Sequence, residues 1–384
     1  MSETTKQSSK TLGIGLIGTG FMGKTHALAY RTAKAVMGEG VPDIKLALLC
    51  DTPADQAERM ANQLGFEKAT DRWQDLVSSP DVDVVSITTP NKFHFEMALE
   101  AIRAGKHVYC EKPLALTLEQ ALEMKNAAEK AGVRTMVGYN YIKNPIFAHA
   151  CQLIGAGAIG RIVHFRGWVD EDYQANPDLH WTWRSTLADA GLGTLGDLGC
   201  HLVSMACGLV GPVESLIAEM QTVHETRPLP DGSGKAAVEN EDTATALIRF
   251  ESGVHGSLST SRSAWGRKNR LAWEVHGTKG MICFDQERMN ELQLYQNEGP
   301  VSEQGFKTIL AGPAHAPYGN FCPAPGHQLG FNDLKVIEAA TFLTAIAEDR
   351  EASPNFADAY AFEKVIHAVA QSARTEKRIR LSDL

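Results

Sequence analysis

The first third of the chain alternates short apolar runs with amphipathic helical stretches. Five runs have the length and composition of strands: Leu12–Ile17, Ile44–Cys50, Val82–Ile87, His107–Cys110 and Val133–Val137. Four helical patterns separate them, at about residues 21–36, 54–64, 93–104 and 117–131. Alternating strands and helices predict βαβ units and a parallel sheet. In such a sheet ligands bind outside the carboxyl ends of the strands, so the turns that follow the strands are where chemistry is expected.

After about residue 150 the pattern changes to longer segments with alternating apolar and polar positions. The strand candidates are Arg161–Val169, Val213–Val223, Thr243–Phe250, Val254–Thr260, Leu271–His276, Met281–Phe284 and Leu292–Tyr295. Turn residues between consecutive segments predict a mostly antiparallel sheet. Three helical patterns accompany it: Gly196–Leu209, Asp333–Ala347 and Ala357–Glu376. Two segments are expected to be loops, Thr226–Asp242 and Ala311–Gly330.

These two patterns predict two domains. Residues 11–136 form an α/β domain with a doubly wound parallel sheet, and residues 137–384 form an α+β domain with a large, mostly antiparallel sheet. The last helix is a candidate to pack back on the first domain. The open face of the large sheet is expected to pair subunits into a homodimer or homotetramer.

Composition excludes several classes of protein. Of the 384 residues, 43% are hydrophobic and 22% charged, which is typical of a globular chain rather than of a disordered or membrane-spanning one. The 37 basic and 46 acidic residues give a net charge of −9. Nucleic-acid binding depends on clustered Lys and Arg, so nucleic acid is not an expected partner. The longest apolar stretch, Leu202–Val213, is too short to cross a bilayer, so a membrane is not expected either.

The cysteines and the first residues bear on the compartment. The first ten residues are polar and contain no apolar stretch, which is unlike an export signal. The seven cysteines form an odd set without a CxxC motif, and reduced thiols are the simplest interpretation. A cytoplasmic location is therefore expected. No HExxH motif or Cys/His cluster indicates a metal site.

The turn after the first strand carries a dinucleotide-binding fingerprint. Gly18, Gly20 and Gly23 occupy the positions of G-x-G-x-x-G, and a helix begins directly after the second glycine. Gly18 allows a tight turn, Gly20 lets a pyrophosphate approach the backbone, and Gly23 allows close packing of helix on strand. The free N–H groups of the helix start, which include those of Phe21 and Met22, favour an anion.

Asp51, at the end of the second strand, indicates which dinucleotide binds. It lies 28 residues beyond Gly23, against roughly 20 in the usual pattern, and the loop at residues 37–42 accounts for the excess. A carboxylate there accepts hydrogen bonds from the ribose hydroxyls and repels a 2′-phosphate. No Lys or Arg follows before Arg59. NAD is therefore favoured over NADP.

Three further segments carry residue types suited to hydride transfer from an alcohol. Thr89, Pro90, Asn91 and His94 follow the third strand, and Glu111-Lys112-Pro113 follows the fourth, so both turns are expected beside the nicotinamide half of the cofactor. A partly desolvated Lys112 can stabilise developing alkoxide charge. Asp197 and His201 are four residues apart, so they share one face of a helix, and an imidazole can take the hydroxyl proton.

Each of these motifs also has an interpretation without chemistry. Glu-Lys-Pro alone is more often a solvated turn, and Asp197 with His201 alone is more often a helix cap and a buried core histidine. Taken together and in this order, the motifs resemble those of the Gfo/Idh/MocA family of oxidoreductases, from Gly13 to the terminal helix. Within that family the sequence is most similar to sugar and glycoside 3-dehydrogenases. One departure is Ile142-Lys143, where relatives often carry Arg.

The resemblance implies site residues and an activity. It implies Lys112, Asp197 and His201 as catalytic residues, with His201 as the general base, and adds Asn140 to the cofactor site. A polyol pocket needs oriented polar groups and aromatic faces. The substrate-binding candidates are Lys112, Tyr139, Lys143, Tyr173, Trp183, Arg184, Asp197 and His201.

We therefore expect NAD-dependent oxidation of a secondary hydroxyl, at C3 by the resemblance, of a sugar, glycoside or anhydrosugar. The alternatives are a myo- or scyllo-inositol dehydrogenase, an NAD-binding regulatory protein without turnover, and an enzyme that retains its cofactor and recycles it between two sugars.

Overall fold

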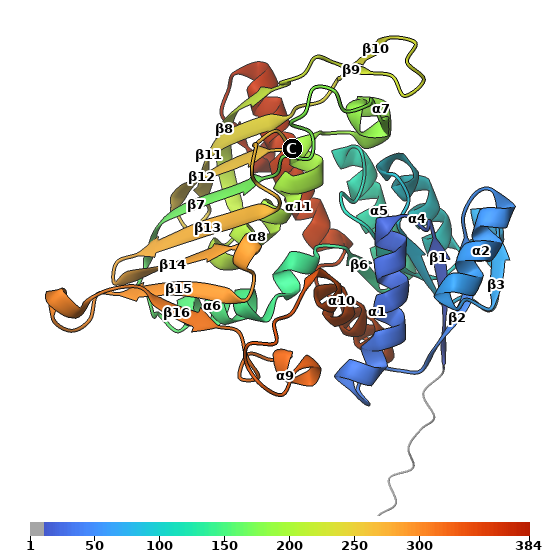
Figure 1. Ribbon diagram of the computed structural model, residues 1–384, viewed down its shortest axis with the longest axis horizontal. Coiled ribbons are helices and arrows are strands. Elements are labelled where there is room, and N and C mark those ends of the chain that lie inside the picture. The colour runs from blue at the N-terminus through green and yellow to red at the C-terminus, as the bar shows by residue number, and fades with distance from the viewer. Residues whose placement is uncertain (1–10) are drawn as a thin grey trace, which may run out of the picture.

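The computed structural model describes residues 11–384 and divides them between two sheets that stand side by side (Figure 1). Two long helices near the end of the chain join the halves, α10 (Phe331–Ala347) and α11 (Phe356–Thr375). Helix α10 packs on the first helix of the N-terminal half, and α11 contacts a helix of that half as well as the large sheet. Both halves are therefore bridged by the C-terminal helices.

The N-terminal sheet has six strands in the order β3-β2-β1-β4-β5-β6, and every neighbouring pair is parallel. Its strands are β1 (Leu12–Ile17), β2 (Ile44–Cys50), β3 (Lys68–Thr70), β4 (Val84–Ile87), β5 (His107–Cys110) and β6 (Thr135–Val137). Its helices are α1 (Phe21–Met37), α2 (Ala54–Leu64), α3 (Trp73–Ser78), η1 (Asn91–Phe93), α4 (His94–Arg103) and α5 (Leu118–Ala131). The order reverses between β1 and β4, the switch point at which Rossmann folds bind dinucleotides. The predicted doubly wound parallel sheet is confirmed.

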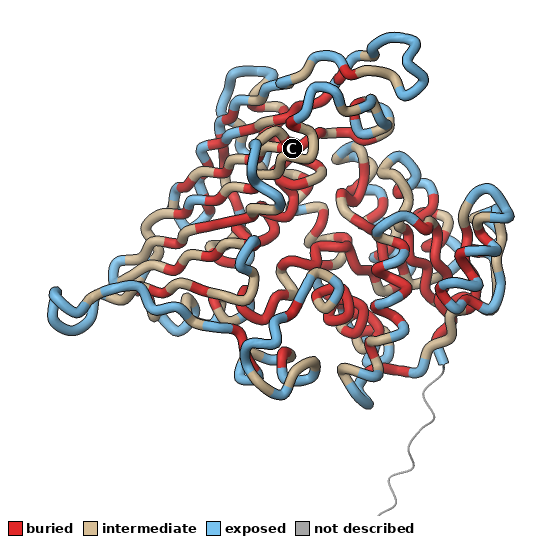
Figure 2. Tube along the Cα trace, in the orientation of Figure 1, coloured by how far each residue is buried: buried red, intermediate tan, exposed pale blue. Residues whose placement is uncertain are grey.

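Both faces of this sheet are covered, so its strands are apolar throughout. In β1, Ile14 joins the core cluster beneath α1 and α10, whereas Ile17 joins the cluster beneath α3 and α4 on the other face. Figure 2 shows the buried strands at the centre of this half and the exposed positions on its outer helices. A parallel sheet covered in this way presents only its strand ends to a ligand.

The second sheet has nine strands in the order β16-β15-β14-β13-β7-β12-β11-β8-β17. Its strands are β7 (Ile162–Asp170), β8 (Val213–Gln221), β11 (Thr243–Phe250), β12 (His255–Ser261), β13 (Arg270–Gly277), β14 (Gly280–Asp285), β15 (Glu291–Gln296), β16 (Lys307–Leu310) and β17 (Ile379–Arg380). All neighbours are antiparallel except β12 and β7. The mostly antiparallel sheet is confirmed.

One face of the large sheet is covered by helices and the other is open. Helices α6 (Pro145–Gly155), α8 (Cys200–Val210) and α11 contact the covered face. Along β11, Ala246 and Ile248 are buried, whereas Leu247 and Arg249, which alternate with them, are exposed. The alternation follows from the two-residue period of a strand with one face in the core.

Several elements differ from the sequence-based prediction. The expected loop at residues 226–242 contains a short hairpin, β9 (Thr226–Pro228) with β10 (Lys235–Ala237), and the other expected loop contains a four-residue helix, α9 (Tyr318–Phe321). The short elements η2 (Asn140–Lys143), η3 (Trp183–Ser185), α7 (Leu187–Ala190), η5 (Gln286–Arg288), η6 (Val301–Glu303) and η7 (Leu381–Asp383) were also not predicted. Such elements are too short to show a hydrophobic period.

The helix expected at residues 196–209 has a different start. A π-helical turn, η4 (Leu195–Gly199), precedes α8. It forms next to a close backbone approach, since a Cβ on Gly193 would lie 2.1 Å from the carbonyl oxygen of Glu241. π-Helical turns occur frequently at functional sites.

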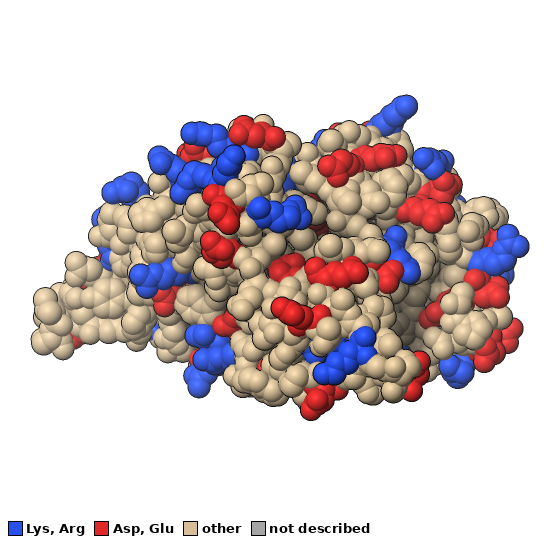
Figure 3. Space-filling model, turned by 90° about the horizontal axis from the view of Figure 1, so that it is seen from above, with Lys and Arg blue, Asp and Glu red and all other residues tan. Residues whose placement is uncertain are grey.

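The segment Leu187–Val210 is long and apolar enough to cross a membrane by length and composition, but 78% of its most apolar window is buried inside the molecule. This is the behaviour of a core helix. On the face seen in Figure 3, basic and acidic side chains are interspersed rather than gathered by sign.

Candidate active site

A cleft of about 1050 Å³ runs along the carboxyl ends of the N-terminal strands and into the second half of the molecule. The turns after β1, β2, β4 and β5 form one wall. Residues of the second half form the other wall, among them Glu171, Tyr173, Asp197 and His201. The cleft therefore brings together the predicted cofactor fingerprint and the predicted catalytic residues.

The glycine turn has the shape that a pyrophosphate requires. Gly18 has a φ of 93°, which favours glycine, and a Cβ on Gly23 would lie 2.1 Å from the Gly18 carbonyl oxygen. A Cβ on Gly20 would meet no atom within 4 Å, so the backbone there is open to a ligand. Helix α1 begins at Phe21 without a side-chain cap, which leaves N–H groups free for an anion. These residues, together with Met22, fit NAD.

Asp51 stands at the end of β2, on the adenosine side of the cleft. Its Oδ2 accepts a 2.9 Å hydrogen bond from the Thr19 amide and another from the Thr19 hydroxyl, which fixes the carboxylate against the glycine turn. Among the described residues that line the cleft, the Lys and Arg side chains are Lys112, Arg184 and Arg262, none of which is in the β1–β2 region. The surroundings of Asp51 favour a ribose diol over a 2′-phosphate.

The turn after β4 lies across the cleft from the second half. Thr89, Pro90 and Asn91 line the cleft, and Asn91 Nδ2 donates a 2.9 Å hydrogen bond to the carbonyl of Ala190. His94 is not among the lining residues. Its buried ring lies between the carbonyl oxygens of Pro113 (2.9 Å) and Thr89 (3.0 Å), so it braces the two turns. Burial lowers the pKa of His94, so the neutral ring donates one hydrogen bond, to one of these two carbonyls. The structure therefore places His94 behind the cleft, between the two turns, and not in the lining where a cofactor contact was expected.

Glu111 anchors the turn after β5 in a buried charged network. Its Oε1 lies 2.7 Å from His26 Nε2 and 2.6 Å from Lys335 Nζ, and Lys335 also contacts Glu338 at 2.7 Å. Burial alone would raise the pKa of Glu111, but the Lys335 ammonium and the His26 hydrogen bond hold it well below its usual value. Glu111 is thus ionised and fixed one residue before Lys112.

Lys112 and Asp197 form a half-buried ion pair that joins the two halves. Lys112 Nζ lies 2.9 Å from Asp197 Oδ1 and donates to the Asp197 backbone carbonyl at 2.5 Å. Tyr173 OH donates to Asp197 Oδ2 at 2.6 Å. Burial opposes both charges, yet their mutual attraction raises the pKa of Lys112 above its usual range and holds that of Asp197 well below. Both groups are therefore charged at neutral pH.

His201 lies in an aromatic setting beside this pair. Its ring centroid is 4.5 Å from that of Tyr141 and 5.9 Å from that of Tyr139, and its Nδ1 is buried without a hydrogen-bond partner. Burial, and secondarily the Lys112 charge, lowers the pKa of His201 well below its usual value. The imidazole is neutral at pH 7 and can accept a proton.

The π-helical turn η4 sets the positions of Asp197 and His201. The amides of Thr194 and Leu195 donate to Glu241, through its carbonyl and its carboxylate respectively, both at 2.9 Å. No hydrogen bond joins Asp197 to His201 among the described residues; Asp197 turns to Lys112 and Tyr173 instead. The two side chains share the cleft, as their spacing predicts, but the partner of the carboxylate is the lysine.

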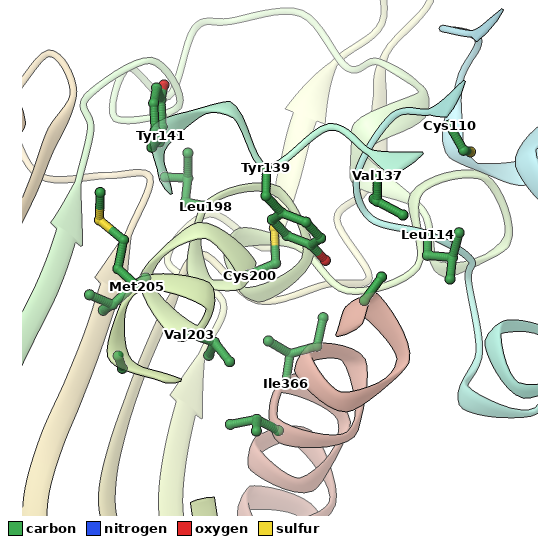
Figure 4. Close-up of a cluster of buried hydrophobic side chains, with 14 of the residues drawn as sticks. Cys110, Leu114, Val137, Tyr139, Tyr141, Leu198, Cys200, Val203, Met205 and Ile366 are labelled. Atoms are coloured by element: carbon green, nitrogen blue, oxygen red, sulfur yellow. The ribbon is translucent and has the colours of Figure 1, made fainter. Parts of the chain in front are cut away.

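The other predicted substrate residues divide between the cleft and its surroundings. Tyr173, Trp183, Arg184 and the cofactor candidate Asn140 line the cleft. Tyr139 does not: it is fully buried between β6, α8 and α11, with its ring 5.2 Å from that of Phe362 (Figure 4).

Lys143 is likewise absent from the cleft lining. Its ammonium donates a 2.5 Å hydrogen bond to the carbonyl of Ser353. The bond directs its side chain to the segment before α11, so the structure does not support the expected substrate contact.

Several residues of the site were not found from the sequence, and three of them have a clear place in it. Glu171 lines the cleft directly after β7, and Phe331 lines it at the start of α10, with its ring 5.4 Å from that of Phe21. Lys335 does not line the cleft, but its ammonium contacts the Glu111 carboxylate at 2.6 Å and holds it in place. Glu171 belongs to the acidic triplet that ends a predicted strand, which was an available signal. No local pattern could have located the other two, because their partners lie some two to three hundred residues away.

The comparisons with known proteins agree with this geometry. Residues 12–139 match a model described as the oxidoreductase family with an NAD-binding Rossmann fold, and residues 147–283 match the GFO/IDH/MocA C-terminal domain. The chain is 39% identical over 381 residues to levoglucosan dehydrogenase of Pseudarthrobacter phenanthrenivorans, covering 96% of this chain and 97% of the relative. It is 30% identical over 288 residues to myo-inositol 2-dehydrogenase of Thermotoga maritima, covering 74% of this chain and 79% of that one.

Solved structures give the same result. A complex of levoglucosan dehydrogenase with NADH and levoglucosan aligns with a TM-score of 0.93 over 97% of this chain and all of that one. An NAD-binding oxidoreductase from Klebsiella pneumoniae, 42% identical, aligns with the same score over 97% and 99% of the two chains. With both family domains matched and a relative similar along its whole length, this chain belongs to the Gfo/Idh/MocA family of NAD-dependent oxidoreductases.

Proposed function

We propose that this protein oxidises a secondary hydroxyl of a sugar, glycoside or anhydrosugar to a ketone, at C3 by its resemblance to sugar and glycoside 3-dehydrogenases. The observation that carries the proposal is the Lys112–Asp197–Tyr173 cluster with a neutral His201, at the inner end of a cleft that begins with a dinucleotide fingerprint. Oxidation of an alcohol by hydride transfer needs a base that takes the hydroxyl proton and a cation that stabilises the charge on the oxygen, and the carboxylate orients that cation.

The roles of the side chains follow from their charge. His201 takes the hydroxyl proton on its imidazole, which becomes imidazolium. Lys112 faces the same oxygen and stabilises the negative charge that develops on it. Asp197, held by Lys112 and Tyr173, orients the ammonium and offsets its charge in the buried site. When bound, NAD supplies the hydride acceptor.

The cofactor would be held along the N-terminal wall. The free amides at the start of α1 take the pyrophosphate, and Asp51 takes the ribose hydroxyls. Thr89, Pro90 and Asn91 lie on the path to Lys112, together with Asn140 from the second half.

A substrate panel tests the proposed function. Purified protein with NAD is offered sugars, glycosides, the anhydrosugar levoglucosan, and myo- and scyllo-inositol, and NADH formation is followed. Faster reduction with the sugar group supports the proposal. Faster reduction with the cyclitols supports the second candidate, inositol dehydrogenation, which the 30% identity to myo-inositol 2-dehydrogenase favours. Tight NAD binding without reduction of any substrate would indicate a regulatory protein.

Asp51 is expected to determine the choice of cofactor. The change Asp51→Asn keeps an acceptor for the Thr19 amide but removes the charge, so the ratio of kcat/KM for NADP to that for NAD should rise about 10- to 100-fold, as expected for loss of charge-assisted hydrogen bonds and of repulsion. Steady-state kinetics with both cofactors measure this ratio. Asp55→Asn, which lies outside the cleft lining in the first turn of α2, is the control. An unchanged ratio would contradict the role of Asp51.

The open face of the large sheet supports the proposal of a homodimer or homotetramer. Leu247 on β11 is 59% exposed and pairs in register with Ile217 on β8, which is 37% exposed, so two apolar side chains lie adjacent on this face. We expect sedimentation velocity at micromolar concentration to show an oligomer, and Leu247→Glu to shift it toward monomer. A monomeric wild-type chain would contradict the proposal.

The seven free cysteines fit a reducing, cytoplasmic setting.

A further inference from the structure

Glu171 occupies a fixed position in the cleft that the proposed mechanism does not use. It follows the last residue of β7, where its amide donates to the carbonyl of Ser261 and its carbonyl accepts from the amide of Ala264, both at 2.9 Å. These two bonds hold the backbone on both sides. The side chain lines the same cleft as Lys112, Asp197 and His201.

The Glu171 carboxylate is without a protein partner. Among residues 11–384 no hydrogen bond or ion pair involves it, whereas its neighbours are engaged: Asp172 pairs with Lys268 at 2.6 Å, and Tyr173 bonds to Asp197. A partly buried carboxylate loses hydration, and this loss is offset only when hydrogen-bond donors replace the water. A ligand with hydroxyl groups supplies such donors.

The surrounding charges make this position sensitive to protonation. Burial, then the nearby Asp197 carboxylate, raises the pKa of Glu171 to about 7, with Lys112 opposing and Asp172 adding to the rise. The Tyr141 hydroxyl, also within its field, does not ionise in this range, since burial raises its pKa to about 12. Glu171 thus changes charge near neutral pH, while His201, which lines the same cleft, is already neutral.

We propose that Glu171 is a specificity-determining residue that accepts a hydrogen bond from a second hydroxyl of the substrate, apart from the one oxidised. This inference rests on the proposed function and sharpens its substrate class. A carboxylate at this point favours neutral, hydroxyl-rich substrates. It disfavours sugars that carry a phosphate or carboxylate at the group facing it, because like charges would meet in a partly desolvated cleft.

The test compares Glu171→Gln with the wild type on the best substrate of the panel. The variant should raise KM about 10- to 100-fold with a smaller change in kcat, as expected for loss of a charge-assisted hydrogen bond made in both the ground and transition states. The wild-type kcat/KM should fall as pH drops through about 7, where Glu171 takes up a proton, and Glu171→Gln should lack this limb. NADH affinity, measured by fluorescence, should be unchanged.

Two further variants keep the test decisive. Asp172→Asn, in the same segment but outside the cleft lining, should retain the wild-type KM and keep the pH limb, moved only slightly to lower pH because Asp172 adds little to the raised pKa of Glu171. Glu171→Asp retains the charge, so it should keep the pH limb with an intermediate KM, and it replaces Glu171→Gln if that variant does not fold. Wild-type KM and pH profile in Glu171→Gln would overturn the inference while leaving the function intact. If no polyol of the panel leads the wild-type protein to reduce NAD, the proposed function itself would be overturned.

Discussion

Replacing Lys112 with methionine is expected to lower kcat/KM about 1,000-fold while NAD still binds. Lys112 provides the partly buried cation that faces the developing alkoxide, and removal of one preorganised group of this kind costs about 10²–10³ in kcat. The change also removes the ion-pair partner of Asp197, whose pKa would rise because burial would then be opposed chiefly by the Tyr173 hydrogen bond. Geometry and charge are therefore lost together.

His201→Ala should have a comparable effect, about 10²–10⁴-fold in kcat, because the hydroxyl proton then has no base to accept it. Both variants are measured by NADH absorbance with the panel's best substrate, and NADH binding is measured separately by fluorescence. Lys68→Met is the matched control, since Lys68 forms an exposed ion pair with Asp81 away from the cleft. Turnover near the wild-type rate in Lys112→Met or His201→Ala would remove that residue from the mechanism.

The parts of the fold that were predicted correctly are those with a clear local sequence pattern. Strands β1, β2 and β5 have the predicted bounds, because buried parallel strands are apolar over their whole length and end at turn residues. Strand β3 and helix α3 were missed. β3 is a three-residue edge strand that starts with an exposed lysine, and α3 has only six residues, so neither shows a recognisable pattern.

The residues of the site also divide into those that local sequence patterns predict and those that depend on distant contacts. Gly18, Asp51 and Lys112 lie at strand ends, where topology alone brings them to one edge of the sheet, and the structure places all three in the cleft. Tyr139 and Lys143 follow β6, and nothing local indicates that their side chains turn away, toward Phe362 and Ser353. Contacts of this kind depend on α11 and the segment before it, which lie about two hundred residues further along the chain.

The buried network beneath Glu111 shows what sequence patterns could not reveal. Lys335 occupies a position of α10 that faces the first domain, and its side chain is fully buried between Glu111 and Glu338. Tyr109 also donates its hydroxyl proton to Glu338. A lysine in a helical pattern is normally assigned to the solvent face. Its burial is tolerable because Glu111, from the turn after β5, joins Glu338, which lies three residues further along the same helix.

Lys335→Met is therefore expected to destabilise the protein by about 3–5 kcal/mol, the usual cost of removing one partner from a buried ion pair. Methionine fills a similar volume, so the loss comes from charge rather than from a cavity. Glu111 would keep His26 as a partner at 2.7 Å, but Glu338 would keep only Tyr109. Urea unfolding monitored by circular dichroism measures the difference, with Lys68→Met as an exposed control expected to change stability by less than about 1 kcal/mol.

The loss of folding stability in Lys335→Met should be larger at high pH than at low pH. In the wild type the pKa of Glu111 lies below its unfolded value, so the stability it contributes is present above that value and disappears as pH falls through the folded pKa. Without Lys335, burial prevails and the pKa values of Glu111 and Glu338 rise, so each carboxyl is most costly when ionised. The destabilisation by Lys335→Met should thus be greater at pH 8 than at pH 5, where protonation relieves the unpaired charge. An equal loss at both pH values would show that Lys335 stabilises the fold through packing, and that the charge of Glu111 is not set by this lysine.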